Sequence, residues 1–162
     1  MTNRIKNAID IFLDAINKGT LVKGHCAACA VGNLVAAGMG GTITINYDYG
    51  EAKCDKDNWA WNLYFFTCGG KQKVTNYMQD VPSVVKNIKA TEFTGKELMK
   101  IEYAFETNTD IPLADYQYCS PEAIRADQIS GLNAVVKVML GFDDCSDSVA
   151  EVFTNKAELI AV

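Results

Sequence analysis

The chain has 162 residues, of which 49% are hydrophobic, and it carries 20 acidic against 15 basic residues for a net charge of −5. A chain of this length and composition can bury a core of its own, so we expect one globular domain over residues 1–162. The acidic balance argues against nucleic acid and membrane as partners, because affinity for nucleic acid or an anionic membrane begins with lysine and arginine.

The first predicted element is an amphipathic helix between Thr2, which can cap it, and Gly19, which ends it. Its charged residues are spread along its length, unlike the apolar core of a signal peptide, and no later stretch is long enough for a membrane span. We therefore expect a soluble, cytoplasmic protein. In that reducing compartment its six cysteines are mostly thiols.

The segment that follows, residues 24–41, reads GHCAACAVGNLVAAGMGG. Residues 26–37 of it include no charged side chain and are apolar on all sides, while Gly32 and Gly38 permit close backbone approach. A helix that is apolar all round belongs in the interior of a protein. We therefore predict a buried helix over residues 26–37 at the centre of the domain.

A β-hairpin is predicted next, because two segments have the period-two character of strands. The first strand is expected in TITINYDYG (42–50) and the second in NWAWNLYFFTCGG (58–70), connected by the charged segment GEAKCDKDN. Trp59, Trp61 and Tyr64 are candidate ligand-binding residues, because aromatic faces stack on flat ligands. The alternative is that these aromatics pack the hairpin onto the helices, since two-stranded sheets need such packing to persist.

Helical patterns return in the second half of the chain. We expect a short helix over 83–90, a helix after the capping box TGKE at 94–97, and a long helix from the SPEA cap at 120–123 to Gly141. A last helix is expected to follow the acidic turn at 143–147. The predicted fold class is therefore mostly α (α+β): a compact bundle of about six helices around the buried small-residue helix, with one short β-hairpin.

The C-x-x-C pair of Cys26 and Cys29 directly follows His25, the only histidine of the chain. At a helix start, cysteines with this spacing lie one turn apart, where the helix dipole favours the thiolate. Cys26 would then be the nucleophile and Cys29 the resolving thiol of a redox or cysteine-dependent enzyme, and His25 completes the catalytic candidates. Two alternatives stay open, namely a zinc-stabilised structural domain and a pair of small buried side chains.

Several complete motifs are absent from the sequence. A single histidine rules out a papain-like or Ser-His-Asp mechanism and an H-E-x-x-H metalloprotease. No phosphate-binding glycine motif occurs, and no second cysteine pair completes a zinc site. Glu102, Glu106 and Asp127 could gather on facing helices for a divalent metal or acid–base chemistry, but charges on a solvated helix face are far commoner. We therefore expect no metal and no cofactor.

Three segments, GHCAACAVGN, KIEYAFETNT and ADQISGLNAVVKVM, lie between the first cysteine pair and Met139. Together they resemble a group of small uncharacterised proteins encoded by phages and mobile elements of gut-type bacteria. The resemblance implies an accessory protein in the cytoplasm of a bacterial host cell, and it brings no catalytic residue. Accessory proteins of this kind often act by binding, either masking a host protein or sequestering a small molecule.

An ample core without a complete catalytic constellation favours a non-enzymatic binding or regulatory module. The partner we expect is a host protein or a small-molecule ligand, with self-association into a homodimer as a further option. A thiol enzyme centred on Cys26 and Cys29 is the first alternative function, and a zinc-stabilised domain is the second.

Overall fold

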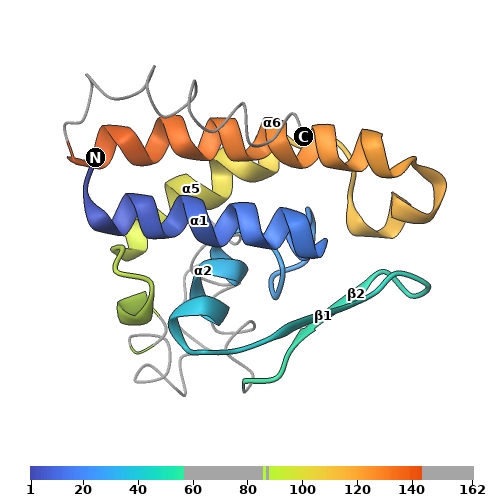
Figure 1. Cartoon of the computed structure of the whole chain (residues 1–162), viewed down its shortest axis with the longest axis horizontal. Coiled ribbons are helices and arrows are strands. Elements are labelled where there is room, and N and C mark those ends of the chain that lie inside the picture. The colour runs from blue at the N-terminus through green and yellow to red at the C-terminus, as the bar shows by residue number, and fades with distance from the viewer. Residues whose placement is uncertain (57–85, 87, 144–162) are drawn as a thin grey trace, which may run out of the picture.

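The computed structural model describes residues 1–56, 86 and 88–143, and its fold is mostly α with one two-stranded antiparallel hairpin (Figure 1). The predicted fold class is thereby confirmed. In chain order the elements are α1 (Asn3–Lys18), α2 (Ala30–Gly38), β1 (Ile43–Asn46), β2 (Glu51–Cys54), α5 (Gly95–Thr107), the 3₁₀ helix η1 (Leu113–Tyr118), α6 (Pro121–Leu140) and the 3₁₀ helix η2 (Gly141–Asp143).

Helix α1 forms where the sequence predicts it. Thr2 before it is extended, and Gly19 after it takes the left-handed conformation, with a φ of 70°, that ends many helices. A fully buried isoleucine or phenylalanine contributes about 1.5–3 kcal/mol to stability relative to an exposed one, so the buried face of α1 holds the helix on the core. That face consists of Ile5, Ala8, Ile9, Phe12, Ala15 and Ile16.

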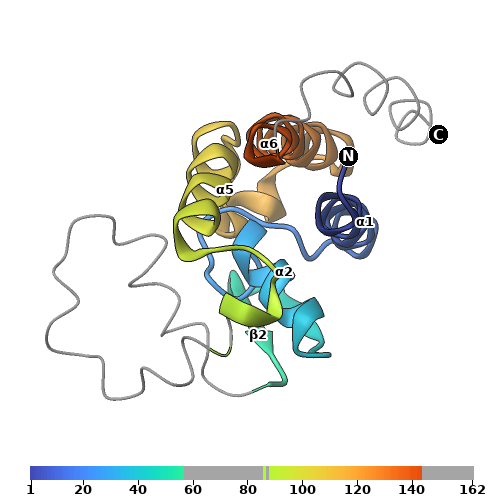
Figure 2. The same ribbon diagram turned by 90° about the vertical axis from the view of Figure 1, so that its left-hand side faces the viewer.

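Helix α2 is a short helix that is buried along most of its length. It packs against both α1 and α5, and α6 packs against the same two helices on the side opposite to α2 (Figure 2). All residues from Ala30 to Ala36 are buried. The predicted buried helix of small apolar residues is therefore confirmed, although it begins at Ala30 and not at Cys26.

The late start of α2 has a local cause, because the residues before it form a turn. The backbone N–H groups of Ala28 and Cys29 both donate to the carbonyl of His25, at 3.0 and 2.8 Å. Gly32 leaves room for this turn, since a Cβ there would lie 2.4 Å from the carbonyl oxygen of Cys26. The chain enters the helix only after the second cysteine.

The predicted hairpin exists, but its second strand was placed wrongly. β1 pairs with β2, with Ile43 opposite Cys54, so the segment expected as the connection is itself the second strand. The chain reverses through residues 47–50, ending at Gly50 with a φ of 60°. A short turn costs less chain entropy than the long connection that we expected.

Two other predictions fall on residues outside the described ranges. These are the aromatic strand over 58–70, with its candidate ligand-binding residues Trp59, Trp61 and Tyr64, and the last helix after residue 147. The short helix predicted over 83–90 is described only at residues 86 and 88–90, which are helical.

Both predicted helix caps in the second half are present. The Thr94 side chain accepts a hydrogen bond from the backbone N–H of Glu97, whose carboxylate accepts one from the backbone N–H of Thr94 at 2.7 Å. Ser120 caps α6 through the N–H of Ala123. The two capped helices approach closely at Gly131, where a Cβ would lie 2.7 Å from the ring of Phe105.

The buried apolar side chains of the described residues form two clusters. The larger lies among α1, α2, α5 and α6. Cys29 belongs to the larger cluster and Ala28 to the smaller one, so the segment GHCAAC crosses the boundary between them. The smaller cluster comprises Val22, Ala27, Ala28, Ala52, Leu113 and Tyr116.

Candidate functional site

The two cysteines of the C-x-x-C pair have different surroundings. Cys26 is partly buried, whereas Cys29 is 3% exposed and is the N-cap residue of α2. The Cys29 sulfur accepts a hydrogen bond from the backbone N–H of Gly32 at 3.4 Å, and its thiol donates to the carbonyl of Cys26, also at 3.4 Å. Cys29 thus has the role that serine or aspartate usually plays at a helix start.

His25 belongs to the same turn. Its Nδ1 accepts a hydrogen bond from the backbone N–H of Ala27 at 3.4 Å. Burial lowers the pKa of His25, and the nearby Glu51 carboxylate opposes this effect only in part. The imidazole is therefore neutral at physiological pH, with Nδ1 engaged by the backbone of its own turn.

Two glutamates of α5 accept hydrogen bonds from the backbone on either side of the cysteine pair. The carboxylate of Glu106 accepts from the backbone N–H of Gly24 at 3.1 Å, and the carbonyl of Glu106 accepts from Lys23 Nζ at 2.8 Å. The carboxylate of Glu102, which is 2% exposed, accepts from the backbone N–H of Val31 at 3.1 Å. Helix α5 is therefore hydrogen-bonded to the chain on either side of the cysteine pair, at Gly24 and at Val31.

The three carboxylates that could have gathered for metal or acid–base chemistry are distributed instead. Asp127 on α6 accepts from the backbone N–H groups of Asp110 and Ile111, at 2.7 and 3.2 Å. Glu102 accepts from Val31 in α2, and Glu106 accepts from Gly24. Each carboxylate satisfies backbone donors of a loop or helix start. Within the described ranges, no three histidine, cysteine, aspartate or glutamate side chains lie together as metal ligands.

Two buried amides bind backbone carbonyls within the GHCAAC segment and in the connector that precedes it, and the sequence predicted neither. The Asn33 amide donates to the carbonyls of Thr20 and Ala28, both at 2.8 Å. Gln128 on α6 donates to the carbonyl of Leu21 at 2.7 Å. Asn33 is the single polar side chain of α2. A lone amide in an apolar helix predicts a buried hydrogen-bonding residue, because a buried amide must find partners.

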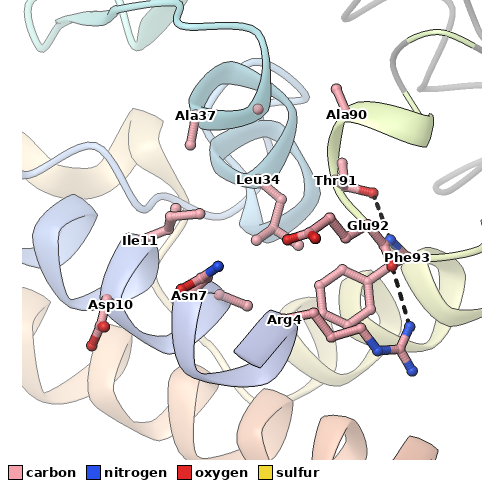
Figure 3. A pocket seen from close by; sticks show the side chains of 12 residues that line it. Arg4, Asn7, Asp10, Ile11, Leu34, Ala37, Ala90, Thr91, Glu92 and Phe93 are labelled. Carbon is pink, nitrogen blue, oxygen red and sulfur yellow. Dashed lines mark hydrogen bonds between the residues drawn. The ribbon is translucent and has the colours of Figure 1, made fainter. Parts of the chain in front are cut away.

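A groove lies at the other end of α2, between α1, α2 and residues 90–93 (Figure 3). Its volume is about 410 Å³. Gly38 brings two of its walls together, because a Cβ there would lie 2.1 Å from the carbonyl oxygen of Ala90. The apolar part of the lining includes Ala8, Ile11, Leu34, Ala37 and Phe93, and the polar part includes Arg4, Asn7, Asp10, Thr91 and Glu92.

The guanidinium of Arg4 is held on one wall of this groove. It donates to both carboxylate oxygens of Glu97, at 3.0 and 3.1 Å, and to the carbonyl of Glu92 at 3.2 Å. It also lies 4.9 Å from the centre of the Phe93 ring. Burial raises the pKa of Glu97, but the hydrogen bonds from Arg4 and Thr94 outweigh it and hold that pKa below its usual value.

Glu92 has an unusual backbone conformation at the rim of the groove. Its φ is 62°, and among the described residues it is the only non-glycine with a positive φ. This left-handed conformation costs roughly 1–2 kcal/mol for a residue with a side chain. It directs the Glu92 side chain into the groove toward Leu34 (Figure 3).

Comparison of the chain with protein-family models, with curated proteins and with solved structures found no match. None of the helices in the described ranges is long and apolar enough to cross a membrane. Function must therefore be inferred from the GHCAAC segment and from the groove. The groove went unpredicted because its lining comes from three segments far apart in the sequence.

Proposed function

We propose that this protein is a non-enzymatic binding module that takes a small ligand in the groove between α1, α2 and residues 90–93. The observation that carries this proposal is the groove itself. Its volume of about 410 Å³ is in the range of small-molecule sites. A lining that combines apolar side chains with polar groups is also found in such sites.

The surroundings of the C-x-x-C pair support binding over thiol chemistry. Cys29 is buried and caps α2, and the Nδ1 of His25 accepts a hydrogen bond from the backbone N–H of Ala27 in the turn. Glu102 and Glu106 satisfy backbone donors on either side of the pair. The segment that resembles a catalytic motif thus has a structural role that accounts for most of its polar groups.

A thiol function of Cys26 is the second candidate, because this cysteine is partly exposed beside the start of α2. Helix starts favour the thiolate. Native alkylation with iodoacetamide tests it: rapid, selective labelling at Cys26 supports a reactive thiol. Labelling no faster than that of the partly buried Cys54 and Cys119 removes this candidate.

The biological setting that we propose rests on the sequence resemblance alone. An accessory protein of a phage or mobile element, acting in a bacterial host cell, would use the groove to sequester a small host molecule. Masking of a host protein and self-association into a homodimer are further proposals of the same class.

A fragment screen followed by ¹⁵N–¹H NMR tests ligand binding in the groove. We expect fragments to shift the backbone amides of Asn7, Leu34 and Thr91. Ala37→Trp would fill the groove from an exposed position and should abolish those shifts, whereas Ala126→Trp, at an exposed position of α6, should keep them. Shifts that persist in Ala37→Trp, or a screen without any shift at the groove amides, would contradict the proposal.

A further inference from the structure

We infer that the ligand of the groove is a small organic cation, an ammonium group carried on an apolar body; this inference rests on the binding function proposed above. It follows from the charges that line the groove. Those charges are Arg4, Asp10 and Glu92.

The positive charge of Arg4 is already matched. Its guanidinium forms a two-point pair with Glu97 and also donates to a backbone carbonyl of the groove wall. Two-point pairs of arginine with a carboxylate are among the strongest hydrogen-bonded pairs in proteins. An anionic ligand would therefore have to compete with Glu97 for the guanidinium.

The negative charge of Glu92 is not matched in the same way. Its side chain is directed into the groove (Figure 3), and within residues 1–56, 86 and 88–143 its carboxylate forms no ion pair. Asp10, the other acidic residue of the lining, has an interaction partner of its own, and its carboxylate is directed away from Leu34 and Glu92 (Figure 3). Because Arg4 is paired with Glu97, the Glu92 carboxylate is the charge of the described lining that a ligand can match, and it favours a cation.

The apolar lining defines the rest of the ligand. Ala8, Leu34 and Phe93 are buried beneath the groove, and Ile11 and Ala37 extend the apolar surface on either side. A neutral apolar ligand would cover this surface but would also strip water from the Glu92 carboxylate without compensation. An ammonium group on the same body supplies that compensation as a charge-assisted hydrogen bond.

The experiment compares three probes that share one apolar body, a phenyl ring on a four-methylene chain, and differ in charge: 4-phenylbutylamine, 4-phenylbutanol and 5-phenylpentanoate. Each is titrated into ¹⁵N-labelled full-length protein at neutral pH, where the amine is protonated and the acid is ionised. We expect the amine to bind about tenfold tighter than the alcohol, with the carboxylate weakest, and added salt to reduce the advantage of the amine.

Variants at Glu92 test whether this carboxylate makes the difference. Glu92→Gln should reduce the affinity for the amine to that for the alcohol and leave the alcohol unchanged. Glu92→Gly removes the carboxylate while suiting the positive φ, so it should give the same result in a protein at least as stable. Asp14→Asn is the control: it removes one negative charge from α1, at a position outside the groove lining, and should keep the preference for the amine.

The outcomes separate the inference from the function on which it rests. If the alcohol or the carboxylate binds the groove as tightly as the amine, the inference of a cationic ligand is wrong, whereas the proposed binding function stands. If Glu92→Gln retains the amine preference, the inference also fails. If neither these probes nor the screened fragments shift the groove amides, the binding function fails together with the inference.

Discussion

The carboxylate of Glu102 on α5 accepts a hydrogen bond from the backbone N–H of Val31, in the first turn of α2, at 3.1 Å, although Glu102 is only 2% exposed. The first N–H groups of a helix lack partners within it, and the helix dipole favours negative charge at that end. A buried glutamate thus joins α5 to the start of α2. The relationship explains why a charged residue occupies the core face of α5.

Replacing Glu102 should therefore destabilise the protein. Glu102→Ala leaves the Val31 N–H without this acceptor and should lower the free energy of unfolding by about 1.5–3 kcal/mol. Glu102→Gln keeps an acceptor oxygen and should cost less. Urea unfolding measures both, with Tyr103→Ala, an exposed position on the same helix, as the control. Unchanged or raised stability in both Glu102 variants would contradict the assigned role.

Gly32→Ala tests the close packing of the GHCAAC turn on α2. The new Cβ would lie 2.4 Å from the carbonyl oxygen of Cys26, so backbone must shift, and we expect a loss of about 1–3 kcal/mol. Gly141→Ala is the matched control, because a Cβ there would meet no described atom within 4 Å beyond its chain neighbours and its own helix, and its φ is −72°. In thermal unfolding, the melting temperature of Gly32→Ala should be clearly lower than that of Gly141→Ala. Equal melting temperatures would show that the turn can move away from the new Cβ without loss of stability.

Acidification should destabilise the protein partly through His25. Its folded-state pKa lies below the usual value of about 6.5, because burial disfavours the charged imidazole. The unfolded state then binds more protons as the pH falls below neutrality, and stability declines until the folded-state pKa is passed. His25→Gln should flatten the stability profile in this window. If the stability of His25→Gln changes with pH as steeply as that of the unchanged protein, groups other than His25 cause the pH dependence.

The pair of Arg4 and Glu97 should contribute at neutral pH and lose its contribution in acid. The folded-state pKa of Glu97 is lowered, so its stabilisation is present above the unfolded-state pKa and is lost as the pH falls through the folded-state pKa. A double-mutant cycle of Arg4→Ala and Glu97→Ala should give a coupling of about 1 kcal/mol at neutral pH. The coupling should vanish at acid pH. Coupling that does not change with pH would exclude an ionic pair.

Local patterns were sufficient to predict α1, α2, α5 and α6. Apolar spacing placed α1, and the TGKE and SPEA caps placed the starts of α5 and α6, because these signals act within one or two helical turns. The absence of charge placed α2 in the interior. Its start was missed because Cys29 caps it, and cysteine is not among the usual capping residues.

Apart from the hairpin, the errors concern partners that are distant in the sequence. The hairpin partner was misplaced because the aromatic segment had the stronger strand pattern, whereas the short turn at 47–50 decided the pairing. Neither Glu102 nor Gln128 has a local signal for the backbone group that it binds. The groove depends on packing among α1, α2 and residues 90–93, which no local pattern encodes.

The most direct test of the central claim, that this protein binds a small ligand in the groove and uses its C-x-x-C segment structurally, is to map phenylbutylamine binding by amide shifts over the whole chain. We predict that the largest shifts cluster at Asn7, Leu34 and Thr91 and are lost in Ala37→Trp, with little change over residues 24–29. Shifts centred on residues 24–29, or none at the groove amides, would contradict the account.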